Sequence, residues 1–180
     1  MINNNNNSTV VGKYIVGNKF ENMIVDNLSM FQPNNSYILR NINLYSNRLN
    51  KFVEIDILFV TPNGIYCIES KYVSTKLVGD TKDTMWEVHN AFGKNLVYNP
   101  FMQNLEHIRC LKQYLRLKGY STNKIYNVIM VPDKAEIESD CGLVRNAKDW
   151  LFEIAENLYE ETEEINVERV FKILEYYEVI

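Results

Sequence analysis

Two β-rich segments joined by a short turn constrain the fold of this chain more than any other feature. Residues 52–61 are rich in β-branched and aromatic side chains, residues 62–64 read Pro-Asn-Gly, and residues 65–72 resume the same pattern. Such side chains favour strands, and Pro-Asn-Gly is a turn signal. The sequence therefore predicts a β-hairpin.

Charged side chains interrupt this otherwise apolar hairpin. Asp56 lies in the first segment, and Glu69 and Lys71 lie in the second. Side chains alternate across a strand, so Glu69 and Lys71 share a face, and a tight turn directs Asp56 toward the same place. Burying a charge without a partner costs several kcal/mol, so these three charged side chains require partners of opposite charge or a bound ion.

Two interpretations of this cluster are open from the residues alone. The first is a structural ion pair of Lys71 with Asp56 or Glu69 at the solvated end of the hairpin. The second is a site for a hard cation, because two carboxylates and a backbone carbonyl such as that of Ser70 suit Mg²⁺, which keeps waters in its other positions. Lys71 would then activate a bound water or stabilise charge on phosphate.

The remaining patterns predict helices around a sheet. Helical spacing predicts a helix over 17–31, and alternation predicts a strand over 36–45 with an irregularity near Asn41. A long helix opens at Asn99-Pro100, with Asn99 as its N-cap, and ends at Gly119. Further predicted elements are a short strand over 86–89, a solvated loop containing Asp80 and Asp83, a strand over 124–131, and helices over 147–160 and 167–177.

This order predicts an α/β fold with a central mixed β-sheet flanked by helices and two C-terminal helices. The chain has 180 residues, 46% of them hydrophobic, which suffices for one core. We expect a disordered polar tail over 1–10 and a single domain over 11–180. Trp86 is expected in the core or as a lid over the site, with stacking on a base as the less favoured use. His107 either hydrogen-bonds near the site or, more commonly for a lone helix histidine, is a packed or surface residue.

Composition excludes several classes of function. The net charge of −4 excludes a protein that coats nucleic acid by general basicity, although a local basic rim would serve a nuclease. The cysteines, Cys67, Cys110 and Cys141, form no CxxC pair, which argues against a zinc site or a disulfide framework. The N-terminal asparagine run is not a signal peptide, and no segment is apolar enough to span a membrane, so we expect a cytoplasmic protein without membrane contact.

The spacing of Asp56 and Glu69-Ser70-Lys71 on a hairpin after an acidic helix resembles the PD-(D/E)xK nuclease superfamily. A longer ordered series resembles the NERD (nuclease-related) domain over roughly residues 13–131. It consists of Gly17 and Glu21, Glu54-Ile55-Asp56, Asn63-Gly64-Ile65, Ile68-Glu69-Ser70-Lys71, Trp86, Asn99-Pro100, Gln103-Asn104 and His107. The chain departs from the family pattern at Phe20, Ile57 and Ser70, none of which is a side chain expected to bind metal.

The resemblance implies a restriction-endonuclease-like αβββαβ core and a Mg²⁺-dependent endodeoxyribonuclease, with Mn²⁺ as a substitute metal. It implies Asp56 and Glu69 as metal ligands, joined by Glu21 and the Ser70 carbonyl, and Lys71 as the catalytic lysine. Gln103 is expected either to hold Lys71, a metal-bound water or a nucleotide, or only to form helix-start hydrogen bonds.

The expected function is hydrolysis of DNA, in defence or DNA processing. The alternative is a catalytically silent module that binds nucleic acid or protein on the same scaffold. DNA is the expected partner, and a homodimer or a helicase or ATPase acting in trans would be consistent with it. Several basic residues either line a phosphate path or are ordinary solvated charges: Lys76, Lys82, Lys94, Arg109, Lys112 and Arg116.

Overall fold

The fold is described by a computed structural model over residues 5–90, 93–160 and 164–175. Its elements in chain order are α1 (Asn5–Met30), β1 (Tyr37–Ser46), β2 (Lys51–Thr61), β3 (Gly64–Ser70), β4 (Lys76–Val78), β5 (Met85–Asn90), β6 (Gly93–Tyr98), α2 (Pro100–Leu117), β7 (Ile125–Val131), β8 (Glu136–Glu138), β9 (Val144–Asn146), α3 (Ala147–Asn157) and α4 (Val167–Leu174).

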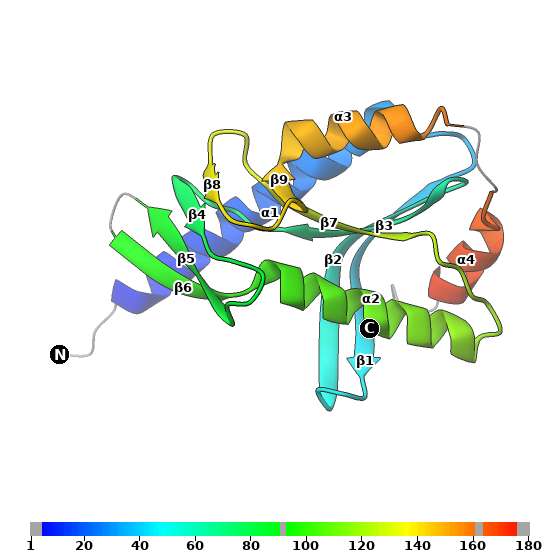
Figure 1. The fold of residues 1–180 in the computed structure, drawn as a ribbon, viewed down its shortest axis with the longest axis horizontal. Helices are drawn as coiled ribbons and strands as arrows, with labels where there is room; N and C mark the ends of the chain where they lie inside the picture. The colour runs from blue at the N-terminus through cyan, green and yellow to red at the C-terminus, as the bar shows by residue number, and fades with distance from the viewer. Residues whose placement is uncertain (1–4, 91–92, 161–163, 176–180) are drawn as a thin grey trace.

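The central sheet has five strands in the order β1-β2-β3-β7-β9. The first three pair antiparallel, whereas β7 and β9 run parallel to β3, so the sheet is mixed. Helices α1 and α3 cover one face and α2 and α4 the other (Figure 1). This arrangement confirms the predicted α/β class with helices on both sides of a mixed sheet.

Each face of the sheet is sealed by its own apolar cluster. On the α1 and α3 side, Ile24 and Leu28 pack against Ile57 and Ile68 of the central strands. A second cluster on the opposite side joins the strands to Ile108, Cys110, Leu111 and Leu115 of α2 and to Val167, Val170 and Leu174 of α4. The hairpin is thus buried on both faces, and a charged side chain within it needs a compensating partner.

An irregularity near the middle of β1 redirects the outer part of the hairpin. Asn41 has φ of 53°, in the left-handed region, as the predicted irregularity requires. Leu39 and Ile42 lie in the same core cluster although they are three residues apart, which a regular strand forbids. On β2, Ile55 and Leu58 likewise belong to one core cluster although they are three residues apart. Asp56 lies between them, at the point where the alternation of side chains is interrupted.

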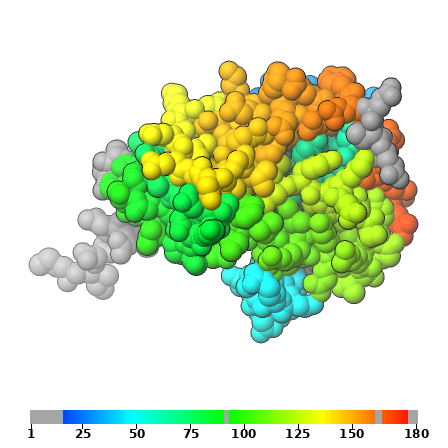
Figure 2. Space-filling model, viewed as in Figure 1, coloured from blue at the N-terminus to red at the C-terminus, as the bar shows by residue number. Residues whose placement is uncertain are grey.

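On the side of Asp56 away from the turn, β2 no longer pairs with β3. The β2–β3 register runs from Thr61↔Gly64 to Ile57↔Ile68, whereas the β1–β2 register continues to Ser46↔Lys51. The outer parts of β1 and β2 therefore form a two-stranded arm, defined here as residues 42–55. Figure 2 shows this arm, coloured cyan, projecting below the body of the molecule.

A second sheet, in the order β6-β5-β4-β8, was not predicted, since the sequence indicated only a short strand over 86–89. That strand is β5, and it is confirmed. Trp86 is fully buried in a third cluster, so it belongs to the core and is not a lid. Asp80 and Asp83 lie in the exposed loop that was expected.

Element ends differ modestly from the predictions. α1 begins at Asn5, twelve residues before the predicted start at Gly17, so residues 5–10 of the expected tail are helical and residues 1–4 lie outside the description. α3 and α4 end earlier than predicted, at Asn157 and Leu174, and residues 176–180 are outside the described part. No helix in the described part is long and apolar enough to cross a membrane.

Candidate functional site

The site begins where the β2–β3 pairing ends. The last register pair is Ile57↔Ile68, and the next residues outward are Asp56 and Glu69. The Ser70 backbone N–H donates to Asp56 Oδ2 at 2.7 Å and so holds that carboxylate against β3. Two carboxylates on adjacent strands therefore lie at the root of the arm, as the hairpin pattern predicts.

Glu69 is the centre of the cluster, with only 1% of the residue exposed. Lys71 Nζ lies 3.0 Å from Glu69 Oε1, and Gln103 Nε2 donates to Glu69 Oε2 at 3.0 Å. Lys71 Nζ also donates to Gln103 Oε1 at 3.5 Å. The ion pair proposed from the sequence is present, and Gln103 contacts both of its members.

Helix α2 carries Gln103 into the site because its first turns are anchored at several points. Asn99 caps the helix by accepting from the N–H groups of Phe101 and Met102, which confirms its predicted role. The next anchor is buried Asn104, which donates to the backbone carbonyls of Cys67 and Val128. These bonds fix how the helix is rotated against β3 and β7.

His107 is the neighbour that sequence reasoning underrated. It is buried, and its Nδ1 lies 3.5 Å from Glu69 Oε2. Burial lowers the pKa of His107, although Glu69 partly opposes this, so the ring is neutral near pH 7. The available signal was its spacing: Gln103 and His107 are four residues apart and therefore share a helix face.

The cluster holds more negative charge than its lysine offsets. Burial, and then the nearby Glu69, raise the pKa of Asp56 to about 8, with a smaller contribution from Glu21. Burial would lower the pKa of Lys71, but Glu69 and Asp56 outweigh it and raise that pKa. The lysine stays charged, while Asp56 is poised to take up a proton or a cation.

Glu21 is placed near the site but on a different partner. Its Oε2 lies 3.5 Å from Arg40 Nη2, and Arg40 Nη1 donates to Asn22. Glu21 nevertheless acts electrostatically on Asp56, because it raises the pKa of that carboxyl. The structure therefore brings Glu69, Lys71 and Gln103 into direct contact and holds Asp56 next to them through the Ser70 N–H. Glu21 lies near enough to act on Asp56 but is paired with Arg40.

A cleft of about 530 Å³ gives access to Asp56. On one side it is lined by Gln103, Glu106 and His107 of α2, and Tyr98 lies before the helix. The other wall comes from the arm and its tip, residues 48, 49, 51–54 and 56. Asp56 thus lies on the wall of a cavity within the size range of ligand pockets.

Comparison with known proteins identifies the family. The model of the nuclease-related domain matches residues 16–132, which runs from α1 to the end of β7 and includes every residue of the cluster. This chain belongs to the NERD family.

One relative of this NERD chain is an uncharacterized protein of Bacillus anthracis, 26% identical over 108 residues. The match covers 58% of this chain, and it spans half the length of that relative. No solved structure matches the chain.

The residues of this NERD chain fit a Mg²⁺ ion that keeps most of its water. In the described residues, no three His, Cys, Asp or Glu side chains are grouped so as to hold a metal by themselves. Magnesium needs only one or two carboxylates, and Asp56 Oδ1 accepts from none of the described residues. Burial and, after it, the negative charge of Glu69 raise the pKa of Asp56, and a divalent cation would favour the ionised carboxylate against both.

Of the six basic residues considered for a phosphate path, Lys82 is exposed in the loop before β5, and the other five separate into two groups. Lys76 pairs with Glu136 and Glu138, and Lys94 pairs with Glu87, so both belong to ion pairs of the second sheet. A different group, Arg109, Lys112 and Arg116 of α2, lines a hollow of about 480 Å³. The helical group is therefore the one that lies along an open surface.

A second buried carboxylate, Glu106, also lies on α2 but faces the tip of the arm. Ser46 Oγ donates to its Oε1, and Arg48 Nε donates to its Oε2 at 2.7 Å. Arg109 Nη1 adds a third bond at 3.3 Å. Burial would raise the pKa of Glu106, but these donors outweigh it and lower that pKa.

Proposed function

We propose that this protein is a metal-dependent nuclease that hydrolyses DNA phosphodiester bonds. The observation that carries the proposal is the convergence of Asp56, Glu69 and Lys71 beside an accessible cleft in a member of a nuclease-related family. Asp56 and Glu69 would bind Mg²⁺ or Mn²⁺ with the Ser70 carbonyl, and Glu21 would support them. Once Asp56 is ionised, the cluster has two carboxylates and one lysine, and it would need a cation to bind phosphate.

When bound, the metal ion would polarise a phosphoryl oxygen and lower the pKa of a water molecule. The chain's own residues would do the rest. Lys71 would stabilise the charge that develops on phosphate, or position the attacking water, with its ammonium directed by Glu69 and Gln103. Gln103 would keep Glu69 oriented, while buried, neutral His107 would exclude solvent from its far side.

The experiment compares Lys71→Ala with Lys76→Ala. The two lysines are matched, because their side chains are 22% and 23% exposed and both are ion-paired, but Lys76 lies outside the cluster. Purified variants are incubated with linear, circular and single-stranded DNA in Mg²⁺, Mn²⁺ or EDTA. We expect metal-dependent cleavage that falls at least about 100-fold in Lys71→Ala and is unchanged in Lys76→Ala.

Cleavage of circular DNA would identify an endonuclease. Retained cleavage in a folded Lys71→Ala variant would remove Lys71 from the mechanism. Cleavage that persists in EDTA would exclude the metal-dependent mechanism.

The second candidate is a module that binds nucleic acid or protein without cutting. The observation in its favour is that both oxygens of Glu69 already have protein partners, Lys71 and Gln103. Such a module has no need of Mg²⁺, so Asp56→Asn would leave its affinity unchanged. A folded wild-type protein that binds DNA equally well in Mg²⁺ and EDTA, and cuts none of the substrates, would favour this candidate.

A further inference from the structure

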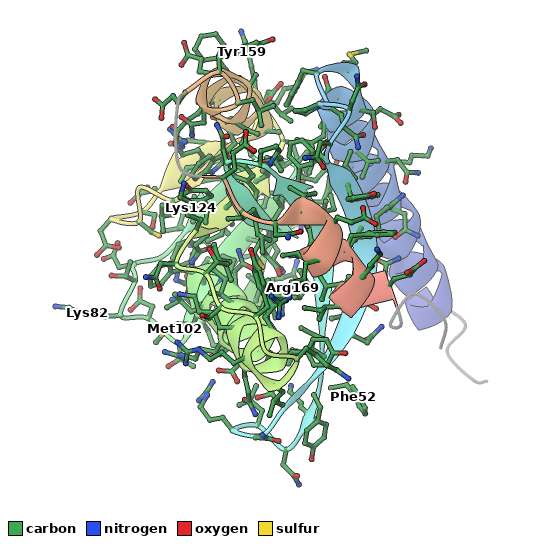
Figure 3. The ribbon with its side chains drawn as sticks, turned by 90° about the vertical axis from the view of Figure 1, so that its right-hand side faces the viewer. Phe52, Lys82, Met102, Lys124, Tyr159 and Arg169 are labelled. Atoms are coloured by element: carbon green, nitrogen blue, oxygen red, sulfur yellow. The ribbon has the colours of Figure 1, made fainter. Side chains whose placement is uncertain are left out.

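Exposed aromatic rings of the arm and of β6 flank the cleft. Phe52 is 60% exposed and Tyr98 is 46% exposed, and both line the same cleft as Asp56. Tyr45 packs edge-on against Phe52, with ring centroids 5.3 Å apart, which supports the Phe52 ring from one side. Figure 3 shows Phe52 at the far end of the arm, away from the body of the molecule. Among the residues that the structure describes, packing leaves about half of each ring open to solvent.

Cations accompany the rings along a continuous path. Arg48 and Lys51 line the cleft at the tip of the arm. Arg48 and Arg109 both bind Glu106, and this bridge joins the cleft to the neighbouring hollow on α2. Arg109, Lys112 and Arg116 line that hollow with no acidic residue among its lining side chains. The hollow is therefore basic in a chain whose net charge is −4, whereas the cleft also carries the carboxyl groups of Glu54, Asp56 and Glu106.

We propose that the arm and the basic side of α2 bind single-stranded DNA, with unpaired bases stacking on Phe52 and Tyr98 and phosphates following the cations of α2. This inference rests on the proposed nuclease function, because it names the form of DNA led to Asp56. The path combines the two features typical of single-strand binding, a positive track and aromatic platforms. Paired bases in a duplex keep their faces stacked and offer none to such rings.

The size of the cleft supports the same conclusion. At about 530 Å³ it is comparable with pockets that enclose small ligands, so it admits one or two nucleotides and not the width of a duplex. A peptide added to the free edge of β2 would gain hydrogen bonds there, but it would leave the cations of α2 unmatched. The charge pattern therefore favours a polyanion with accessible bases.

The test measures binding in EDTA, so that metal-dependent cleavage does not contribute. Fluorescence anisotropy is recorded for labelled oligothymidylate, a blunt DNA duplex of equal length and oligouridylate. We expect the single-stranded DNA to bind at least about tenfold more tightly than the duplex. Phe52→Ala and Tyr98→Ala should each weaken this binding about tenfold, the usual order for one stacked base. The matched control is Phe152→Ala, which removes a 64% exposed ring from α3 on the opposite face.

Double replacement of Lys112 and Arg116 by Gln should reduce the dependence of affinity on salt by about one to two ions, because two phosphate contacts are lost. Stacking can be measured directly by the fluorescence of 2-aminopurine placed in the oligonucleotide. We expect this fluorescence to be quenched by the wild-type protein and not by Phe52→Ala. Equal affinity for duplex and single strand, preferred binding of oligouridylate, or an unchanged affinity in Phe52→Ala would each overturn the inference. Single-strand binding without any cleavage in Mg²⁺ would support it while removing the nuclease function.

Discussion

Glu106 of α2 and the carboxyl pair of Asp56 and Glu69 on the hairpin meet different electrostatic conditions. Glu106 receives hydrogen bonds from Ser46 and two arginines, and its pKa is lowered as a result. In the pair, Glu69 binds the one lysine, while burial and the neighbouring Glu69 raise the pKa of Asp56 to about 8. The first arrangement is satisfied by the protein itself and ties the arm to the helix. The second has two carboxyl groups for one lysine, so Asp56 needs either a proton or a further cation.

A matched pair of substitutions, Glu69→Gln and Glu106→Gln, tests most directly whether the two sites differ in function. We expect Glu69→Gln to lower the rate of DNA cleavage about a thousandfold, the order of effect when several kcal/mol of metal-ion stabilisation are lost. Glu106→Gln should lower the rate by less than about tenfold, because its bonds lie outside the cluster although it lines the same cleft and holds Arg48 and Arg109. Comparable losses in both variants would contradict the division into a reactive and a structural carboxylate.

The same two substitutions should also differ in their effect on stability. Glu69→Gln leaves the mostly buried ammonium of Lys71 without its partner, and we expect the free energy of unfolding to fall by about 3 kcal/mol. Glu106→Gln weakens the bonds of two arginines whose side chains are 56% and 59% exposed, so we expect a smaller loss of about 1 kcal/mol. Urea denaturation of both variants measures the difference. The exposed Glu168→Gln serves as the control and should leave the unfolding midpoint near that of the wild type. A larger loss for Glu106→Gln would contradict this order.

A smaller effect concerns pH. Because the pKa of Asp56 is about 8 in the folded protein and lies near its ordinary value when unfolded, the folded state holds more protons between about pH 4 and pH 8. The contribution of Asp56 to stability is therefore complete below pH 4 and is lost as the pH rises to about 8. Thermal melting in EDTA should show this decline, and Asp56→Asn should flatten it.

Addition of Mg²⁺ at pH 8 should raise the melting temperature of the wild type more than that of Asp56→Asn, since the ion replaces the lost proton. An equal rise in the two proteins would place the ion elsewhere.

Much of the fold was predictable because it is encoded locally. Three short-range signals in the sequence correspond to features of the structure: the Pro-Asn-Gly turn joins β2 to β3, Asn99 caps α2, and Asn41 has a positive φ. The second sheet was missed because β4 and β8 have three residues each and pair in parallel across about sixty residues. β6 is almost wholly exposed and therefore has no buried alternation to reveal it.

The site was predictable to the same extent. Alternation along the hairpin brings Asp56, Glu69 and Lys71 together, and the family resemblance adds Glu21 and Gln103. The partners of these residues were less accessible to sequence reasoning. The approach of His107 to Glu69 depends on the rotation of α2, which the bonds of Asn104 set through tertiary contact. The pairing of Glu21 with Arg40 joins elements whose packing no local pattern specifies.

The early end of the β2–β3 pairing has a consequence for solubility. In the described part of the chain, residues 51–55 of β2 pair with β1 alone, so their other side is an open strand edge. Such edges recruit strands from other molecules and lead to aggregation. Here the edge is only five residues long, carries exposed Lys51 and Glu54, and follows an irregularity that bends it away from the sheet. These features protect the arm from unintended strand pairing while leaving its edge exposed to solvent.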